Sequence, residues 1–134
     1  MALAYGDRRV SLSQMAASQR LSRKYLAQIM NALRAGELVN SARGSAGGYE
    51  LARAPEDIAL SDVYAVLEGP LGLPECVGHP DRCQMAEACP TRDTWAEIGA
   101  AVGTVLAGTT LQDLADRARS RMHTASSTER MYYI

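Results

Sequence analysis

The strongest constraint on the fold is a pair of short helical patterns that follow one another closely between residues 11 and 36. Ser11 and Gln14 form a capping box, which predicts a first helix over about residues 12–19. Ser22 is an acceptable N-cap for a second helix, which Gly36 ends. The apolar residues of this second helix share one face: Tyr25, Leu26, Ile29, Met30 and Leu33. Two short helices joined by a tight turn form a helix-turn-helix.

A β-hairpin is predicted directly after the second helix. The segment ELVNSARGSAGGYELAR indicates a strand near residues 38–42, a turn rich in Gly and Ser, and a returning strand near residues 49–52. Pro55 ends this hairpin, which has the position of a wing. The segment LSDVYAVLEG then predicts a short helix, capped near Ser61 and closed by Gly69. The expected fold is mainly α with a small β wing, and residues 1–69 form a winged helix-turn-helix DNA-binding domain.

The second half of the chain has a different organisation. Residues 70–91 hold Pro, Gly and Cys without a sustained period, so we expect a loop whose length is typical of a functional segment. Residues 92–118 predict two helices, a long one over about residues 92–106 and another after Gly108. The long helix carries an apolar stripe that needs a partner surface: Trp95, Ile98, Val102, Val105 and Leu106. A dimer interface and an intrachain core both meet this need. Residues 119–134 form a tail without assigned structure.

Composition and charge limit the class of protein. Phe is absent and aromatic residues make up 5 %, which favours a helical core of aliphatic residues and Met. The chain has no long apolar run and no secretory signal, so we expect a cytoplasmic protein outside the membrane. Residues 1–53 carry eight basic and three acidic side chains, a net +5, and the remainder carries six basic and twelve acidic, a net −6. A basic first part suggests contact with a polyanion, and solvated faces of opposite sign also fit.

Polar residues at the start of the second helix are candidates for DNA contact, because a helix-turn-helix places that turn against base edges in the major groove. They are Ser22, Arg23, Lys24, Tyr25 and Gln28. Arg43, at the foot of the wing, is a candidate for the minor groove, whose negative potential attracts arginine. Gly44, Gly47 and Gly48 permit close backbone approach. Each helix residue taken alone also fits a solvated surface, and the wing is the feature that favours DNA.

All three cysteines of the chain, Cys76, Cys83 and Cys89, lie in the loop over residues 70–91. In a reducing compartment such a group is typical of metal ligands or redox sensors rather than of a disulfide framework. The spacing is wider than in structural zinc sites, but a flexible loop can fold three thiolates around an iron–sulfur cluster. A thiol switch without metal and three small residues without a role are the alternatives.

Several segments together resemble the winged helix-turn-helix repressors that include the IscR and NsrR iron–sulfur regulators. These segments are YLAQIMNALRAGELV, SARGSAGGYELAR, DVYAVLEGP, TTLQDL and the three cysteines ahead of a helix with a tryptophan. The resemblance covers about residues 3–114. It implies a homodimer that binds palindromic double-stranded DNA and reports nitric oxide, redox state or iron–sulfur supply through a cluster in the loop before the dimerisation helix. By this resemblance, Cys76, Cys83 and Cys89 hold the cluster, and the DNA-contacting positions include Lys24, Gln28 and Arg43.

The sequence departs from this family in three places. An acidic residue that often precedes the DNA-contacting glutamine is Ala27 here, which implies a different base preference. The histidine ligand of IscR-type members is Arg92 here, and the aspartate ligand of NsrR-type members lies in a longer first helix of which MALAY resembles only the final turn. Substitutes close in sequence are Glu75, His79 and Asp81. A four-iron four-sulfur cluster is therefore favoured over a two-iron two-sulfur cluster, because it tolerates one exchangeable iron.

The predicted function is a DNA-binding transcriptional repressor whose operator affinity is controlled by an iron–sulfur cluster. A cluster-free thiol–disulfide switch is the alternative chemistry. A metal-carrying interaction protein that does not bind DNA is the alternative from another functional class. We expect no enzyme, because the two histidines, His79 and His123, fall in a loop and a tail and no nucleophile–base constellation accompanies them.

Overall fold

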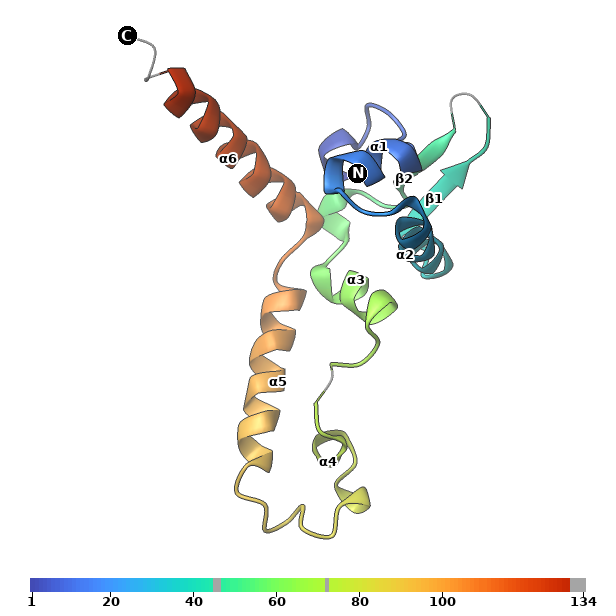
Figure 1. Ribbon diagram of the computed structural model, residues 1–134. Coiled ribbons are helices and arrows are strands. Elements are labelled where there is room, and N and C mark those ends of the chain that lie inside the picture. The colour runs from blue at the N-terminus through green and yellow to red at the C-terminus, as the bar shows by residue number, and fades with distance from the viewer. Residues whose placement is uncertain (45–46, 72, 131–134) are drawn as a thin grey trace.

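The computed structural model describes residues 1–44, 47–71 and 73–130 (Figure 1). It is mainly helical and contains one two-stranded antiparallel sheet, as the sequence predicts. Single turns of 3-10 helix are marked η. The elements in chain order are η1 (Ala2–Ala4), α1 (Leu12–Gln19), α2 (Arg23–Ala35), β1 (Val39–Ala42), β2 (Gly48–Leu51), η2 (Pro55–Asp57), α3 (Leu60–Leu67), α4 (Glu75–Gly78), η3 (Pro80–Arg82), α5 (Arg92–Ala107) and α6 (Leu111–Arg130).

The first two helices begin at the predicted caps. The Ser11 hydroxyl accepts a hydrogen bond from the Gln14 backbone amide (3.2 Å), and Gln14 Oε1 accepts one from the Ser11 amide (3.0 Å). Ser22 Oγ accepts a hydrogen bond from the Tyr25 amide (3.1 Å). Arg20 ends α1 in the left-handed conformation, with φ of 53°, and the chain turns there into α2. The helix-turn-helix is thus fixed by contacts between residues close in sequence.

The two strands form the predicted wing. They pair from Val39 opposite Leu51 to Ala42 opposite Gly48, and each boundary lies within one residue of its predicted place. Tyr49 also forms a bridge to Val10, with both backbone N–O distances at 2.9 Å. The segment before α1 is therefore attached to the base of the wing.

The main hydrophobic core lies within residues 1–69, which we call the head. Its buried members are Ala16, Leu26, Met30, Leu38, Val39, Leu51 and Ile58. Val63 and Val66 of α3 pack against this cluster. Ile58 is 0 % exposed and Met30 is 2 % exposed, and burial of each such side chain contributes about 1.5–3 kcal/mol. The helix-turn-helix, the wing and α3 therefore form one packed unit.

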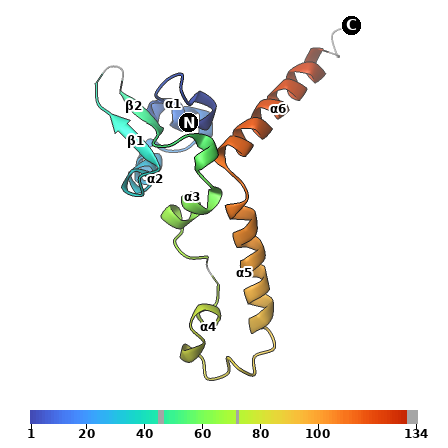
Figure 2. The same cartoon turned by 180° about the vertical axis from the view of Figure 1, so that it is seen from behind.

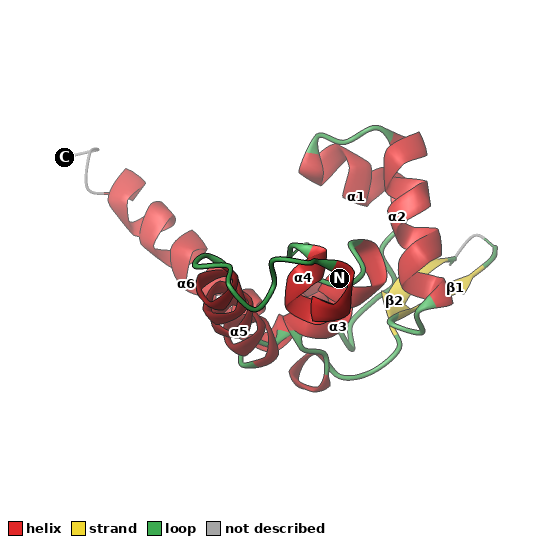
Figure 3. Ribbon diagram, turned by 90° about the horizontal axis from the view of Figure 1, so that it is seen from below, coloured by secondary structure: helices red, strands yellow, loops and turns green. Residues whose placement is uncertain are grey.

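Residues 70–107 extend from the head as an arm, which consists of the cysteine-bearing loop and α5 (Figures 1 and 2). The loop predicted over residues 70–91 contains two short turns, α4 and η3. Both α3 and α4 pack against α5. Seen from below, α1, α2 and the wing lie on one side of the molecule, and α5 and α6 lie on the other (Figure 3).

The predicted cap of α3 near Ser61 is wrong. The helix begins at Leu60, and its N-cap is Ala59, which makes no side-chain cap hydrogen bond. Instead, the Leu60 amide donates a hydrogen bond to the Thr109 carbonyl oxygen (2.8 Å) from the turn between α5 and α6. A partner distant in sequence therefore takes the place of the expected local cap.

The tail over residues 119–134 had no predicted structure. In the structure α6 continues through its first part, without a break between residues 118 and 119, and ends at Arg130. Its first turn is held by Thr110 and Asp113: the Thr110 amide donates to Asp113 Oδ2 (2.8 Å), and the Asp113 amide donates to Thr110 Oγ1 (3.1 Å). No Gly or Pro interrupts the sequence up to Arg130. Residues 131–134 lie outside the described residues. The helix leaves the head in a direction away from α5 (Figure 1).

Candidate nucleic-acid interface and cysteine site

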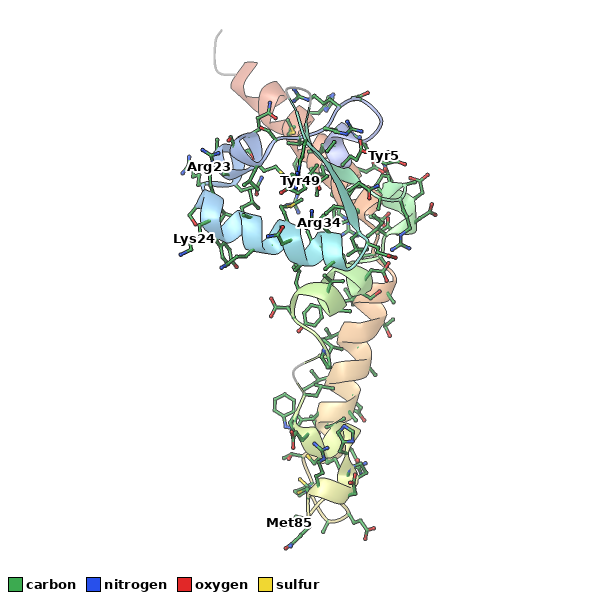
Figure 4. The ribbon with its side chains drawn as sticks, turned by 90° about the vertical axis from the view of Figure 1, so that its right-hand side faces the viewer. Tyr5, Arg23, Lys24, Arg34, Tyr49 and Met85 are labelled. Carbon is green, nitrogen blue, oxygen red and sulfur yellow. The ribbon has the colours of Figure 1, made fainter. Side chains whose placement is uncertain are left out.

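The predicted DNA-contacting residues of the second helix lie on the exposed face of α2. Leu26 and Met30 point into the core and orient the helix, and the polar set faces solvent: Ser22, Arg23, Lys24, Tyr25 and Gln28. Ser22 also caps the helix, because its oxygen accepts the bond from the Tyr25 amide. Figure 4 shows Arg23 and Lys24 together at the end of α2 that is remote from the arm.

The basic residues at this surface have no acidic ion-pair partner in the part of the chain that the structure describes. Within the described residues, the ion pairs are Arg9–Glu50, Arg53–Asp62, Arg82–Glu75 and Arg119–Asp116. Arg23, Lys24 and Arg43 belong to none of them, and all three are exposed. Their positive charge is thus available to an anionic partner.

The wing presents Arg43 next to a tight glycine-containing turn. Gly44 has a φ of +107°, in the left-handed region, and the Gly47 amide donates a hydrogen bond to the Gly44 carbonyl (3.0 Å). A Cβ at Gly47 would lie 2.8 Å from that same carbonyl oxygen, so a larger residue does not fit without a shift. Residues 45 and 46 lie outside the described residues. The predicted glycines Gly44, Gly47 and Gly48 therefore shape the backbone on both sides of the turn.

The three cysteines lie in the arm, at the far end of the molecule from α2. Cys76 is in α4, Cys83 follows η3 and Cys89 precedes α5; each is a free, half-buried thiol. Met85, between two of them in sequence, marks the tip of the arm in Figure 4. No three His, Cys, Asp or Glu side chains of the described residues are close enough together to hold a metal ion.

The three substitute ligands considered from the sequence are also exposed on the arm. Glu75 lies 3.8 Å from the guanidinium of Arg82, in an ion pair that is open to solvent. His79 and Asp81 flank η3 and are exposed. The structure thus brings none of them together with the cysteines as a formed ligand set.

Cys89 differs from an ordinary thiol because of its contacts with Thr91. Its Sγ lies 3.4 Å from Thr91 Oγ1. Hydrogen bonds from the Thr91 hydroxyl and then the Thr91 amide lower the pKa of the Cys89 thiol below its ordinary value, and the positive charge of Arg92 adds a smaller effect in the same direction. Sequence reasoning missed Thr91, although it stands at the N-cap position of a predicted helix.

Two contacts join the cysteine loop to α5. Arg92 Nε donates a hydrogen bond to the Cys76 carbonyl oxygen (3.1 Å). Leu73 packs over Gly99, the buried residue of α5, and a Cβ there would overlap the Leu73 side chain. In the sequence, Arg92 was notable only because it replaces the histidine ligand of IscR-type members. No local pattern predicted its hydrogen bond to the Cys76 carbonyl oxygen, sixteen residues earlier in the chain.

The apolar stripe of α5 is exposed in the single chain. Trp95, Ile98, Val102 and Val105 are 43 %, 44 %, 40 % and 65 % exposed. Leu106, the fifth predicted residue, is half-buried. Most of the predicted interface residues are therefore not intrachain core.

Comparison with known proteins gives the family. The model of the Rrf2 family, described as an iron-dependent transcriptional regulator, matches residues 1–117. The HTH-type transcriptional regulator CymR of Bacillus subtilis is 37 % identical over 115 residues, which are 86 % of this chain and 78 % of that protein. The HTH-type transcriptional regulator IscR of Vibrio atlanticus is 33 % identical over 105 residues, 78 % of this chain and 60 % of the relative.

Solved structures agree with this assignment. The structure of CymR, the global cysteine regulator of B. subtilis, has a TM-score of 0.70 at 37 % identity and covers 87 % of this chain and 84 % of that one. IscR of T. potens has a TM-score of 0.71 at 36 % identity, over 87 % of this chain and 76 % of that one. Among the described residues, no helix combines the length and apolar character needed to cross a bilayer. The chain belongs to the Rrf2 family, and it is a transcriptional regulator rather than an enzyme.

Proposed function

We propose that this chain binds a palindromic operator as a homodimer and represses transcription, with the first turn of α2 in the major groove and the wing in the adjacent minor groove. The observation that carries this proposal is the exposure of Arg23, Lys24 and Arg43 without any acidic partner in the described residues. Duplex DNA supplies the missing negative charge through its phosphates, and guanine edges accept hydrogen bonds from arginine.

The exposed stripe on α5 supports the homodimer. Four large apolar side chains in one row are costly to leave in water, and a second copy of the same helix covers them by twofold symmetry. A twofold protein also matches a palindromic operator, because its two recognition helices meet two equivalent half-sites. Residues 92–118 are therefore proposed as the dimerisation segment.

Cys76, Cys83 and Cys89 are proposed to hold an iron–sulfur cluster, with the four-iron four-sulfur form favoured. The donor chemistry fits, because three free thiols lie in one loop and the Thr91 contacts favour the thiolate of Cys89. The positions of the donors require the loop to close, since the described residues contain no formed ligand set. When bound, the cluster supplies iron that reacts with nitric oxide or oxidants. The iron-dependent description of the family supports this assignment.

A cluster-free thiol switch is the second candidate, and two observations favour it. A disulfide needs two of the three free thiols to come together, one fewer than a cluster needs. The CymR of Staphylococcus aureus, 33 % identical to this chain with a TM-score of 0.67 and coverage of 85 % and 82 % of the two chains, has a solved oxidized form. Here two cysteines form a disulfide, and their two protons and two electrons pass to a cellular oxidant such as a peroxide. In this case too, the arm would be the part of the protein that senses the signal, here an oxidant.

The contacts of the loop with α5 suggest how the arm acts on DNA binding. Arg92 holds the Cys76 backbone at the start of α5, and Leu73 is seated on Gly99 two turns further along. Closing or oxidising the cysteine loop changes these contacts, and so changes how the two heads sit on the dimer axis. Coupling of about 1–3 kcal/mol, which is typical of such links, alters affinity about 5- to 150-fold.

DNA binding is tested first with the promoter upstream of the protein's own gene. We expect retardation in a gel that is salt-sensitive and stronger than for scrambled DNA of the same length. Absence of such binding in every cysteine state would contradict the repressor and leave a metal-carrying interaction protein.

The two chemistries are separated by anaerobic reconstitution with iron and sulfide. A cluster gives visible charge-transfer bands, with iron and sulfide in stoichiometric amounts, and Cys83→Ala loses them. A colourless protein whose DNA binding still depends on redox state would support the thiol switch instead. Iron bound equally by wild type and Cys83→Ala would contradict the assigned ligands.

A further inference from the structure

A second basic feature lies at the base of the wing, where it adjoins the predicted contacts Arg43, Gly47 and Gly48 and adds Arg34 and Ser41, which the sequence did not single out. It is a groove of about 460 Å³ between α1, the end of α2 and the hairpin. Its walls include two cations, two hydroxyls and glycine backbone: Arg34, Arg43, Ser11, Ser41, Gly47 and Gly48. No carboxylate is among the described residues that line it. Such a lining suits an oxyanion with several acceptor oxygens.

Arg34 is the residue that distinguishes this groove. It stands in the last turn of α2 and its side chain is exposed. Its Nη1 lies 3.5 Å from Ser41 Oγ, and among the described residues the guanidinium belongs to none of the ion pairs. Figure 4 shows Arg34 toward the opposite end of α2 from Arg23 and Lys24, below Tyr49 of the wing. A guanidinium has about five N–H donors, so most of them remain available beyond this one contact.

We propose that Arg34, with Ser41, binds a phosphodiester of the operator backbone between the bases read by α2 and the minor groove entered by the wing. This inference rests on the proposed function, since it extends the same DNA surface. Arg23 and Arg34 are about 17 Å apart along the helix, at 1.5 Å per residue. With α2 lying across the major groove, which is about 12 Å wide, this span would carry Arg34 past the base edges to the phosphates at the border of the groove.

The chemistry of the groove favours the DNA backbone over base edges. The groove is open to solvent and lies beside Gly47 and Gly48, where the wing backbone can approach a phosphate closely. A phosphate contact carries no sequence information and fixes the register of the protein on the duplex. Arg34 therefore acts as a positioning residue, whereas the first turn of α2 and Arg43 contact the grooves.

The test compares Arg34→Gln with wild type on operator and on scrambled DNA across a range of salt concentrations. We expect affinity for both DNAs to fall by the same factor, about 3- to 30-fold, and the slope of log affinity against log salt to shrink by about 1 for each bound protomer. Arg34→Lys, which keeps the charge, should retain most of the slope. Thermal unfolding and dimer mass identify any variant that is misfolded, and Ser41→Ala then provides the second perturbation of the same groove.

Arg53→Gln is the matched control, because it removes the same charge from the head at a guanidinium already paired with Asp62. The inference is overturned if Arg34→Gln leaves the slope unchanged, loses affinity for the operator alone, or behaves like Arg53→Gln. Failure of wild type to bind any DNA would remove the proposed function and this inference together, whereas normal binding by Arg34→Gln removes only the inference.

A neutral backbone linkage identifies the source of the phosphate. Operators with a single methylphosphonate are scanned across the half-site and its flank. At one position the loss caused by the neutral linkage should disappear in Arg34→Gln, because both changes remove the same contact. If all losses add independently, Arg34 does not meet a DNA phosphodiester. Inorganic phosphate provides the second arm of this test. If phosphate binding requires Arg34, but no methylphosphonate position in the DNA loses its effect in Arg34→Gln, the groove binds a free anion and the proposal is overturned.

Discussion

The head and the arm of this protein differ in how they use apolar residues. The head encloses its core, and Ile58 is completely buried within it. The arm leaves four large apolar side chains of α5 exposed and has one buried position along that helix, Gly99. The head can therefore be stabilised by contacts within one chain, whereas the arm reaches the same degree of burial only against another surface. The region that carries the cysteines is thus also the region that exposes the apolar stripe proposed as the dimer interface.

The largest expected difference between the head and the arm is in how a truncated apolar side chain changes the free energy of unfolding. Ile58→Ala should lower the free energy of unfolding by about 2–5 kcal/mol, because it removes a fully buried side chain and leaves a cavity. Chemical denaturation monitored by circular dichroism measures this loss, which should be independent of protein concentration. Ile98→Ala is the matched control in the arm, and its cost should vary with concentration because that side chain is covered only in the dimer. If both variants lost the same free energy of unfolding at every protein concentration, the head and the arm would not differ in this way.

A charged side chain within the apolar stripe of α5 is the most direct way to disrupt the proposed dimer. Ile98→Glu places a carboxylate in the proposed dimer seam and should raise the dimer dissociation constant at least about 100-fold, roughly 2.7 kcal/mol, because an unpaired charge is costly to bury. Sedimentation velocity measures the mass. Ala100→Glu adds the same charge at an exposed position on another face of α5 and should leave the dimer intact. A folded Ile98→Glu protein with unchanged mass and DNA affinity would exclude this stripe as the interface.

The proposed minor-groove contact has a smaller expected effect, confined to the head. Arg43→Ala should cost about 1–3 kcal/mol of operator binding, because an arginine in a narrow minor groove meets strong negative potential. Fluorescence anisotropy with labelled operator measures the change. Arg53→Ala, which removes a guanidinium paired with Asp62, serves as the control. If Arg43→Ala binds the operator as tightly as wild type, Arg43 does not contact the minor groove.

The smallest effect concerns the pH dependence of Cys89. Its pKa lies below the ordinary thiol value because Thr91 donates to the sulfur, so the folded protein holds more thiolate at neutral pH than the unfolded chain. Thr91→Val removes the hydroxyl and should move the midpoint of Cys89 alkylation to higher pH, with slower alkylation at pH 7. The Thr91 side chain makes no helix-cap hydrogen bond, so α5 should remain intact.

Peptide mass spectrometry of alkylated protein gives the Cys89 rate, and the Cys76 peptide in the same digest controls for the reagent. An unchanged midpoint in Thr91→Val would show that the Thr91 hydroxyl does not act on this sulfur.

The sequence predicted those parts of the fold that are specified by local contacts. The bounds of α1 and the start of α2 follow from Ser11 and Ser22, whose cap hydrogen bonds reach only three residues along the chain. The predicted cap of α3 failed because the Leu60 amide is satisfied by Thr109, from a segment about fifty residues away. The continuation of α6 was missed because its polar sequence lacks an apolar period.

The candidate site divides in the same way. Most of the exposed set on α2 was predicted because helical periodicity separates it from Leu26 and Met30. The placement of Tyr25 on the apolar face was wrong, because its side chain is 54 % exposed. Arg34 and its groove were not, because the groove forms only when the end of α2 meets the wing. The link from Arg92 to the Cys76 carbonyl likewise joins residues that no short pattern relates. Placing such contacts requires the packed structure.

Communication from the cysteines of the arm to the DNA-binding surface of the head is the central proposal, and one measurement tests it directly. Operator affinity is determined by fluorescence anisotropy for wild-type protein in three states: anaerobically reconstituted, reduced without metal, and oxidised. The same three preparations of Cys83→Ala provide the reference. We predict that at least one state of the wild type differs from another by about 5- to 150-fold, and that this difference disappears in Cys83→Ala. Equal operator affinity of all three wild-type states would contradict the account.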